Sequence, residues 1–254
     1  MRFCALGSGS RGNATLIDSG NTRLLLDCGF PAKELENRAS RAGFDPGTLD
    51  AILVTHEHGD HIRGVGAVAR RYQLPVWATH GTLRNGKCGK LPGEHRISPH
   101  GDSFIIGDIE IQPVPVPHDA NEPCQFVFTA NQKKLGILTD LGCITPLITE
   151  AFQQLDLLLL ECNHDSQMLT DGPYPPALQA RVGGNLGHLN NFQAMSLLES
   201  IETGQLQHLV LGHLSEKNNH PDKVEKVIHE RCSHVADRFS ILEQDTVSAW
   251  FELS

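Results

Sequence analysis

The residues best suited to chemistry lie together in segment 55–61, which reads Thr-His-Glu-His-Gly-Asp-His and follows the apolar run 51–54. Loops at the ends of buried strands are where proteins mount metal-binding and catalytic groups on a rigid base. Imidazole together with carboxylate suits Zn²⁺, Fe or Mn²⁺, and the absence of cysteine from the segment argues against a closed structural zinc site. Solvated histidines at a polar helix start are the alternative. The segment therefore predicts a metal site.

Composition limits the class of protein. The chain has 254 residues, 39% of them hydrophobic, and a formal net charge of −9, which argues against attraction of nucleic acid to the whole surface but allows a local basic groove. Its seven cysteines form no Cys-x-x-Cys pair, as is typical of reduced thiols. We see neither a signal peptide nor an apolar run of 18 residues. We expect one cytoplasmic domain over residues 1–254 with no membrane contact, and make no prediction of its oligomeric state.

Hydrophobic runs and turn residues predict strand hairpins mixed with helices in both halves of the chain. The predicted strands are 1–6, 14–17, 23–27, 50–55, 74–78, a pair within 103–116, 125–129, 135–139, 155–160, 206–211 and 247–251. The predicted helices are 33–42, 61–72 and 223–230, with one more before each of the strands 155–160 and 206–211. Residues 87–99 read as a loop over the site. This pattern indicates an α/β protein with two sheets face to face and helices outside, a four-layer αββα arrangement.

Three more polar residues stand where an apolar run ends. His118 follows 114–117, Asp140 follows 135–139, and His213 follows 209–212. One sheet edge could gather all of them beside segment 55–61. Each alone could be a capping or hydrogen-bonded loop residue. Together they predict the remaining ligands of a binuclear metal site.

The order of these motifs, His-x-His-x-Asp-His and then His, Asp and His, resembles the metallo-β-lactamase fold superfamily over essentially the whole chain. The resemblance implies the αββα fold and two divalent ions, whether Zn, Mn or Fe. It implies the following roles: His56, His58 and His118 bind one ion; Asp60, His61 and His213 bind the other; Asp140 bridges them together with a hydroxide; and Asp27 supports the ligand loop as a buried carboxylate.

Several features separate branches of the superfamily. Secreted β-lactamases lack an aspartate at the position of Asp60, and two aspartates make an oxygen-rich site suited to phosphate. Thioester hydrolases of the glyoxalase-II type can use the same ligands. Segment 7–15 resembles the glycine-serine opening of the phosphodiesterase branch. Segments 160–165, 173–182, 187–191 and 211–219 resemble the YycJ/WalJ-type subgroup of 5′-to-3′ DNA exonucleases. Two departures are Asn190 in place of serine, which also suits a helix N-cap, and Gln179 in place of lysine, which removes a possible phosphate contact.

The expected function is therefore metal-dependent phosphodiester hydrolysis, with a 5′-to-3′ exonuclease on DNA as the leading hypothesis and single-stranded ends as the substrate. A small-molecule hydrolase acting on a cyclic phosphodiester or a thioester is the alternative. A non-catalytic metal-binding regulator is a third hypothesis, against which the complete ligand set argues.

The proposed mechanism and the resemblance also suggest roles beyond metal binding. Asp140 would hold the metal pair, Asp60 would orient the nucleophile, and His188 would face the scissile phosphate as a transition-state stabiliser or proton donor, unless it only caps a helix. Candidate substrate contacts are Ser10 and Asn13, in a glycine-serine loop that is either a phosphate cradle or a plain turn, and Arg181.

Segments 87–99 and 171–187 are the expected pocket walls. The candidates for a basic lip that guides single-stranded ends, or else for an ordinary solvated face, are Arg11, Arg63, Arg84, Lys87, Lys90 and Arg96.

Overall fold

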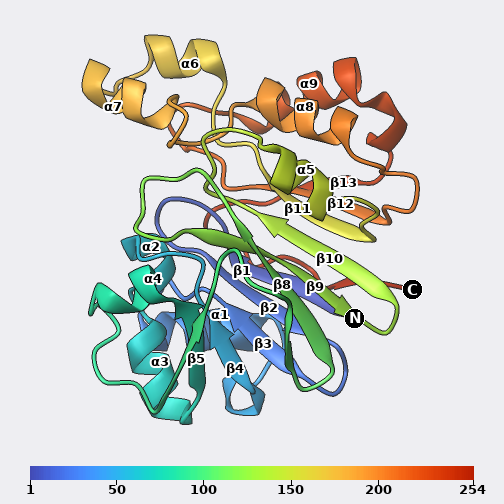
Figure 1. Cartoon of the computed structure of the whole chain (residues 1–254). Coiled ribbons are helices and arrows are strands. Elements are labelled where there is room, and N and C mark those ends of the chain that lie inside the picture. The colour runs from blue at the N-terminus through green and yellow to red at the C-terminus, as the bar shows by residue number, and fades with distance from the viewer.

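Two seven-stranded sheets form the centre of the computed structural model, which describes all 254 residues (Figure 1). The first sheet has the order β14-β1-β2-β3-β4-β5-β6, and the second has the order β13-β12-β11-β10-β9-β8-β7. The strands of the first sheet are β1 (Arg2–Gly7), β2 (Ala14–Asp18), β3 (Arg23–Leu26), β4 (Ala51–Leu53), β5 (Pro75–Thr79), β6 (Gly93–Ile97) and β14 (Phe251–Glu252). Those of the second are β7 (Phe104–Ile106), β8 (Ile109–Pro115), β9 (Cys124–Ala130), β10 (Lys133–Leu138), β11 (Leu157–Glu161), β12 (His208–Gly212) and β13 (Phe239–Ile241).

Side-chain alternation along the strands divides the hydrophobic core into layers. In β11, Leu157 and Leu159 pack between the two sheets, whereas Leu158 and Leu160 pack toward the outer helices. A strand that is covered on both faces needs apolar residues at every position, which explains why its sequence is a continuous apolar run. The four-layer αββα arrangement expected from the sequence is confirmed.

Helices cover the outer face of each sheet (Figure 1). Beside the first sheet lie α1 (Ala32–Arg41), α2 (Gly59–Ile62), α3 (Val65–Tyr72) and α4 (His80–Arg84). Beside the second lie α5 (Pro146–Ala151), α8 (Asn191–Ser200) and α9 (Pro221–Arg231), with α6 (Ser166–Asp171) and α7 (Pro176–Val182) standing apart at one end. None of these helices is both long and apolar enough to span a membrane.

Three sequence expectations about elements were wrong. The single helix expected over 61–72 is two helices, because the Gly64 N–H donates to Cys28 O at 2.7 Å and a Cβ at Gly64 would lie 1.9 Å from Phe30 O. The strand expected over 247–251 shrinks to β14, because Ala5 N–H donates to the Ser248 hydroxyl instead of to a neighbouring strand.

The third error concerns residues 87–99, which do not form a loop over the site. They include β6, which pairs in parallel with β5 at the sheet edge. There Trp77 stacks on His95 and on Phe104, with ring centroids 4.2 and 5.0 Å apart. This stacking favours the strand despite the glycine and proline around it. The helices α4, α6 and α7 and the strand β13 had no counterpart among the sequence predictions.

Strand direction brings the motif residues to one edge of the molecule. Strands β3, β4 and β5 are parallel, as are β10, β11 and β12, while β8 and β10 are both antiparallel to β9 and so share a direction. Carboxyl ends of parallel strands open on the same side of a sheet. The loops after β3, β4, β8, β10 and β12, which carry the predicted ligands, therefore meet there.

Candidate metal centre

Left-handed backbone marks three of the strand ends at this edge. Asp27, Asp140 and His213 follow β3, β10 and β12 with φ angles of 59°, 54° and 57°. Residues that carry a Cβ rarely adopt this conformation, which costs on the order of 1–3 kcal/mol and persists only where the surroundings hold it. The Ser8 hydroxyl contributes by accepting a hydrogen bond from the His213 N–H at 2.8 Å. The turns redirect the chain immediately after each strand.

Three imidazoles converge on one point. Nδ1 of His58 lies 3.1 Å from Nε2 of His56 and 3.1 Å from Nε2 of His118. Nitrogen ligands around a tetrahedral zinc ion are separated by about 3.3 Å, given metal–nitrogen distances of about 2.0–2.1 Å. The three rings therefore have the spacing of ligands to one ion.

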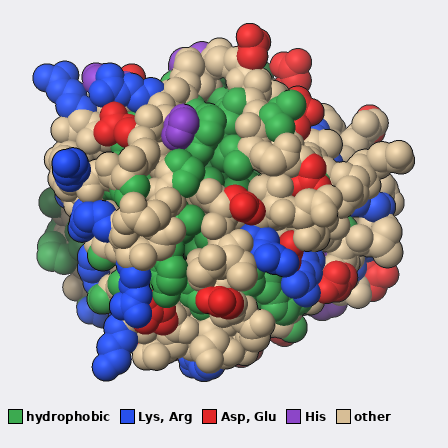
Figure 2. All heavy atoms as spheres, turned by 90° about the horizontal axis from the view of Figure 1, so that it is seen from below, with side chains coloured by type: hydrophobic (Ala, Val, Ile, Leu, Met, Phe, Trp, Pro, Cys, Tyr) green, Lys and Arg blue, Asp and Glu red, His purple; other side chains and the backbone are tan.

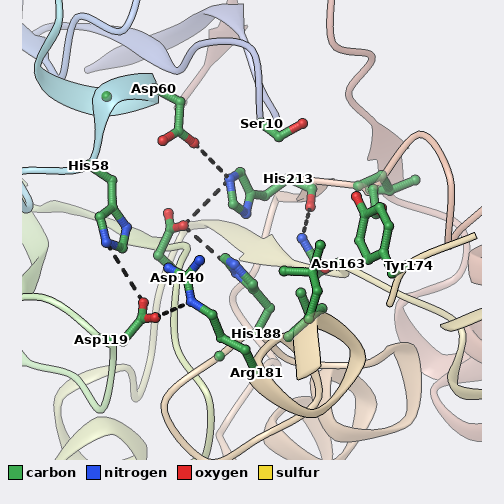
Figure 3. Close-up of a pocket in the computed structure, with 16 residues that line it drawn as sticks. Ser10, His58, Asp60, Asp119, Asp140, Asn163, Tyr174, Arg181, His188 and His213 are labelled. Atoms are coloured by element: carbon green, nitrogen blue, oxygen red, sulfur yellow. Dashed lines mark hydrogen bonds and ion pairs between the residues drawn. The ribbon is translucent and has the colours of Figure 1, made fainter. Parts of the chain in front are cut away.

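A second group of donors lies beside the first. Nε2 of His61 is 3.1 Å from Asp140 Oδ2 and 3.5 Å from Asp60 Oδ2. Nε2 of His213 is 3.5 Å from Asp140 Oδ1, which also lies 4.0 Å from Nε2 of His118. In Figure 3, His58, Asp60 and His213 surround Asp140. The Asp140 carboxylate thus lies between the two groups and could contact an ion in each.

Asp27 fixes the orientation of two of the rings. Its Oδ2 accepts hydrogen bonds from His61 Nδ1–H and from the Thr55 hydroxyl, both at 2.8 Å, and its Oδ1 accepts from Thr55 N–H at 2.8 Å. Because the Thr55 hydroxyl donates to Asp27, it can accept the proton on Nδ1 of His56, 2.9 Å away. Nε2 of His56 and of His61 then carries a lone pair that a metal can bind, which is how supporting residues usually select a tautomer.

Two further acceptors fix the tautomer of His118 and of His213. His118 Nδ1–H donates to Gly187 O at 3.1 Å, and His213 Nδ1–H donates to Glu161 Oε1 at 2.8 Å. The same Glu161 oxygen lies 2.8 Å from Nδ1 of His188. Four imidazoles thus point Nε2 at the centre because their Nδ1 protons are already bound.

Glu161 is a residue to which sequence analysis gave no role. It is fully buried at the end of β11, and its second oxygen accepts from the backbone N–H groups of Leu141 and Leu189. Burial alone would raise the pKa of Glu161, but His188 and His213 lower it to about 2. The available signal was an acidic residue ending a continuous apolar run, the same signal that identified Asp27 and Asp140.

The electrostatics of the two groups differ. Burial lowers the pKa of His56 and His118, so both rings are neutral near pH 7 and can offer a lone pair. Burial alone would also lower the pKa of His213, but Asp140 and Glu161 help to raise it to about 10. The second group therefore favours positive charge at the position where its donors meet.

The donor set fits divalent metal ions. Besides the two groups described, the chain places Asp140, Glu161, His188 and His213 within 4.8 Å of one another by one donor atom each. Asp140 Oδ2 and His213 Nε2 are buried and have no hydrogen-bond partner. Buried polar atoms are normally paired, and Nδ1 of His58 carries at most one proton, so it can donate to only one of the two Nε2 atoms that lie 3.1 Å from it. A cation among them would satisfy all of these atoms.

A polar pocket of about 310 Å³ opens over this centre (Figure 3). Ser10, His188 and Arg181 line it, while Asn13 does not. Asn13 is buried beneath the ligand loop, where its amide lies 3.0 Å from His61 Nε2, so the structure does not place it where a substrate would contact it. The N-cap of α8 is Asn190, which forms a capping box with Gln193, and not His188. His188 is therefore free to face the pocket.

Of the two expected pocket walls, only segment 171–187 is present. It contributes Tyr174, Leu178, Arg181, Val182 and Gly187, whereas no residue of 87–99 lines the pocket. None of the six candidates for a basic lip lines it either.

Sequence analysis also missed three residues that line the pocket or border its ligands. Asp119 pairs with Arg181 and lies 3.7 Å from Nε2 of His58. Asn163 donates to the carbonyl of His213 at 3.0 Å, and Tyr174 closes the side of the pocket opposite Asp119 (Figure 3). Tyr174 lies in the predicted wall 171–187 and Asn163 in segment 160–165, but no pattern singled out either residue, and Asp119 follows His118 directly.

Comparison with known proteins agrees with this geometry. Residues 22–213 match the family described as "Beta-lactamase superfamily domain". The chain is 34% identical to Exodeoxyribonuclease YycJ of Bacillus anthracis over 252 residues, 96% of each chain, and 34% identical to Exodeoxyribonuclease WalJ of Streptococcus pneumoniae over 224 residues, 86% of this chain and 83% of that protein. The solved structure of the metallo-beta-lactamase fold protein YhfI from Bacillus subtilis has a TM-score of 0.75 at 19% identity, covering 97% of this chain and 98% of that one.

Asp27→Asn tests the support of the ligand loop. Asparagine tolerates the left-handed backbone at this position but cannot accept from both Thr55 and His61 as the carboxylate does. We expect affinity for Zn²⁺ to fall roughly 10- to 100-fold, measured by competition with a fluorescent chelator. The exposed Asp237→Asn is the matched control. Wild-type affinity in a folded Asp27→Asn protein would contradict this role.

Proposed function

Because the chain belongs to the beta-lactamase superfamily, and with it to the metal-dependent hydrolases, we propose that it is a 5′-to-3′ exonuclease acting on single-stranded ends of DNA. The observation that carries the proposal is the Asp140 carboxylate between two groups of metal donors on the floor of a polar pocket. The two relatives named as exodeoxyribonucleases, which align with most of the chain, support DNA as the substrate.

Two divalent ions are the proposed cofactors. His56, His58 and His118 would hold one, Asp60, His61 and His213 the other, and Asp140 both. When bound, such ions lower the pKa of a water molecule toward neutrality and offset charge on phosphate oxygens. Zn²⁺ and Mn²⁺ both suit a mixed set of imidazole and carboxylate ligands.

His188 is the proposed proton donor. Hydrolysis forms a bond between phosphorus and the oxygen of water while the ester P–O bond breaks, and the leaving oxygen then needs a proton. Glu161 holds Nδ1 of His188 at 2.8 Å, which leaves Nε2 for this transfer in a ring that is 21% exposed at the pocket. Burial alone would lower the pKa of His188, but Glu161 raises it, so the protonated form is available near neutral pH.

Arg181 and the size of the pocket support a nucleotide substrate. The guanidinium lines the pocket while paired with Asp119, so a phosphate could take up its remaining N–H donors. Ser10 adds a hydroxyl on the opposite wall. A volume of about 310 Å³ is at the small end for ligand pockets and suits one terminal nucleotide at a time.

Two broader assignments belong to the same proposal. We treat residues 1–254 as one domain because both sheets contribute to the core between them. We place the protein in the cytoplasm because all seven cysteines are unpaired and six of them are buried.

The alternative is a hydrolase of a small phosphodiester or thioester, which the net charge of −9 favours because it repels nucleic acid overall. Hydroxyacylglutathione hydrolase of Rhodopseudomonas palustris is 29% identical over 153 residues, 53% of this chain. Assays on DNA, on a thioester and on a cyclic phosphodiester separate the two functions.

Protein loaded with Zn²⁺ or Mn²⁺ is expected to shorten single-stranded DNA labelled at its 3′ end stepwise from the 5′ end, because the ligands of both groups are in place. His58→Ala should abolish shortening, and the exposed His229→Ala should not. Turnover of a thioester or cyclic phosphodiester by a fully loaded protein that leaves DNA intact would contradict the exonuclease proposal.

His188→Gln tests the proton donor. We expect kcat to fall roughly 10²- to 10⁴-fold while KM and metal content stay near wild type, because glutamine keeps polarity but carries no transferable proton. Single-turnover cleavage and metal analysis make the measurement. If the variant loses metal instead, or keeps its kcat, His188 is not the donor.

A further inference from the structure

Residues 63–96 form a cationic surface on an otherwise acidic protein. This stretch holds seven Lys or Arg and a single acidic residue, Glu94, although the chain has a net charge of −9. All seven side chains are exposed. Figure 2 shows Lys and Arg gathered along its left side, the side on which α3 and α4 lie in Figure 1. The basic face, as we call it, consists of Arg63, Arg70, Arg71, Arg84, Lys87, Lys90 and Arg96.

Most of the basic face is not neutralised by the protein itself. Arg71 pairs with Glu36 at 2.8 Å and Arg96 with Glu94 at 3.1 Å. The other five members have no carboxylate oxygen within 4.0 Å: Arg63, Arg70, Arg84, Lys87 and Lys90. By contrast, Arg11, the remaining candidate from the sequence, pairs with both Glu216 and Asp245. The unpaired cations leave a local positive potential that can attract a polyanion.

The basic face adjoins the metal centre. Lys87 Nζ donates to Glu57 O at 2.9 Å, and Glu57 stands between two of the clustered histidines. Arg84 lines a hollow of about 360 Å³ that has no hydrophobic residue in its wall. Glu122 also lines it, and its Oε2 accepts a hydrogen bond from the Gly81 N–H at 2.6 Å. Asn121, also in that wall, donates its N–H to Glu57 Oε1 at 2.9 Å. The hollow and the ligand loop are therefore in direct contact through Glu57.

We propose that the part of a DNA strand not yet degraded lies across the basic face, with its backbone phosphates against the unpaired cations. The proposal rests on the exonuclease function proposed above and extends it to a second contact surface. An enzyme that removes nucleotides of any sequence needs contacts with phosphates and not with bases, which is the contact that Lys and Arg provide.

The test is binding of a fluorescent 20-nucleotide single strand, followed by anisotropy at several salt concentrations. The variant Arg63→Gln/Arg84→Gln/Lys90→Gln removes three unpaired cations of the basic face, none of which hydrogen-bonds to the ligand loop through its side chain. We expect roughly tenfold weaker binding or more, and a plot of log K against log salt shallower by about 2, because each phosphate contact on a single strand contributes about 0.7. KM for the strand should rise while turnover of a dinucleotide stays at the wild-type rate.

The matched control is Lys33→Gln/Arg41→Gln/Lys223→Gln, which removes three exposed and unpaired cations outside the basic face. We expect it to bind like wild type. Equal losses in both triple variants, or no loss in either, would overturn the proposal. If wild type binds DNA through the basic face but cleaves none, the exonuclease proposal fails while the basic face stands. If wild type and the control variant both fail to bind DNA, the basic face is not a DNA-binding surface.

Discussion

The arrangement of the centre depends on buried acceptors that hold the Nδ1 protons of its histidines. Asp27 orients His61 directly and His56 through the Thr55 hydroxyl, and Glu161 orients His213. Without these acceptors each ring could flip or change tautomer, and the Nε2 atoms would not converge. The electrostatic cost of burying two carboxylates is offset because each accepts several hydrogen bonds.

The sheets place these acceptors. Asp27 directly follows β3 and Glu161 ends β11, one in each sheet, so the two halves of the fold each supply one supporting carboxylate. Close backbone packing then brings the chain after β3 against the ligand loop. A Cβ at Gly29 would lie 1.8 Å from Asp60 O, so only glycine lets the chain after β3 approach the ligand loop. Glu161 also links the metal donors to His188 through one oxygen, which couples the position of the proposed proton donor to that of His213.

Sequence patterns predicted most strands and the residues that meet at the centre, because ligands at strand ends follow apolar runs that are easy to recognise. They failed where tertiary contacts overrule local pattern. Gly64 breaks a helix because its N–H is needed by Cys28, and β6 forms because Trp77 stacks on its neighbours. The candidate basic residues were recognised, but their place outside the pocket depends on which loops the fold brings to the metal centre, and no period in the sequence encodes that.

The central claim is that fixed tautomers create two adjoining metal sites that share Asp140. Anomalous diffraction at the zinc edge, from crystals of the zinc-loaded protein, tests it directly. The account predicts two peaks, one bounded by Nε2 of His56, Nδ1 of His58 and Nε2 of His118, and the other by Asp60 and Nε2 of His61 and His213, with Asp140 between them. A single peak, or an ion bound through Nδ1 of His61 or His213, would contradict it.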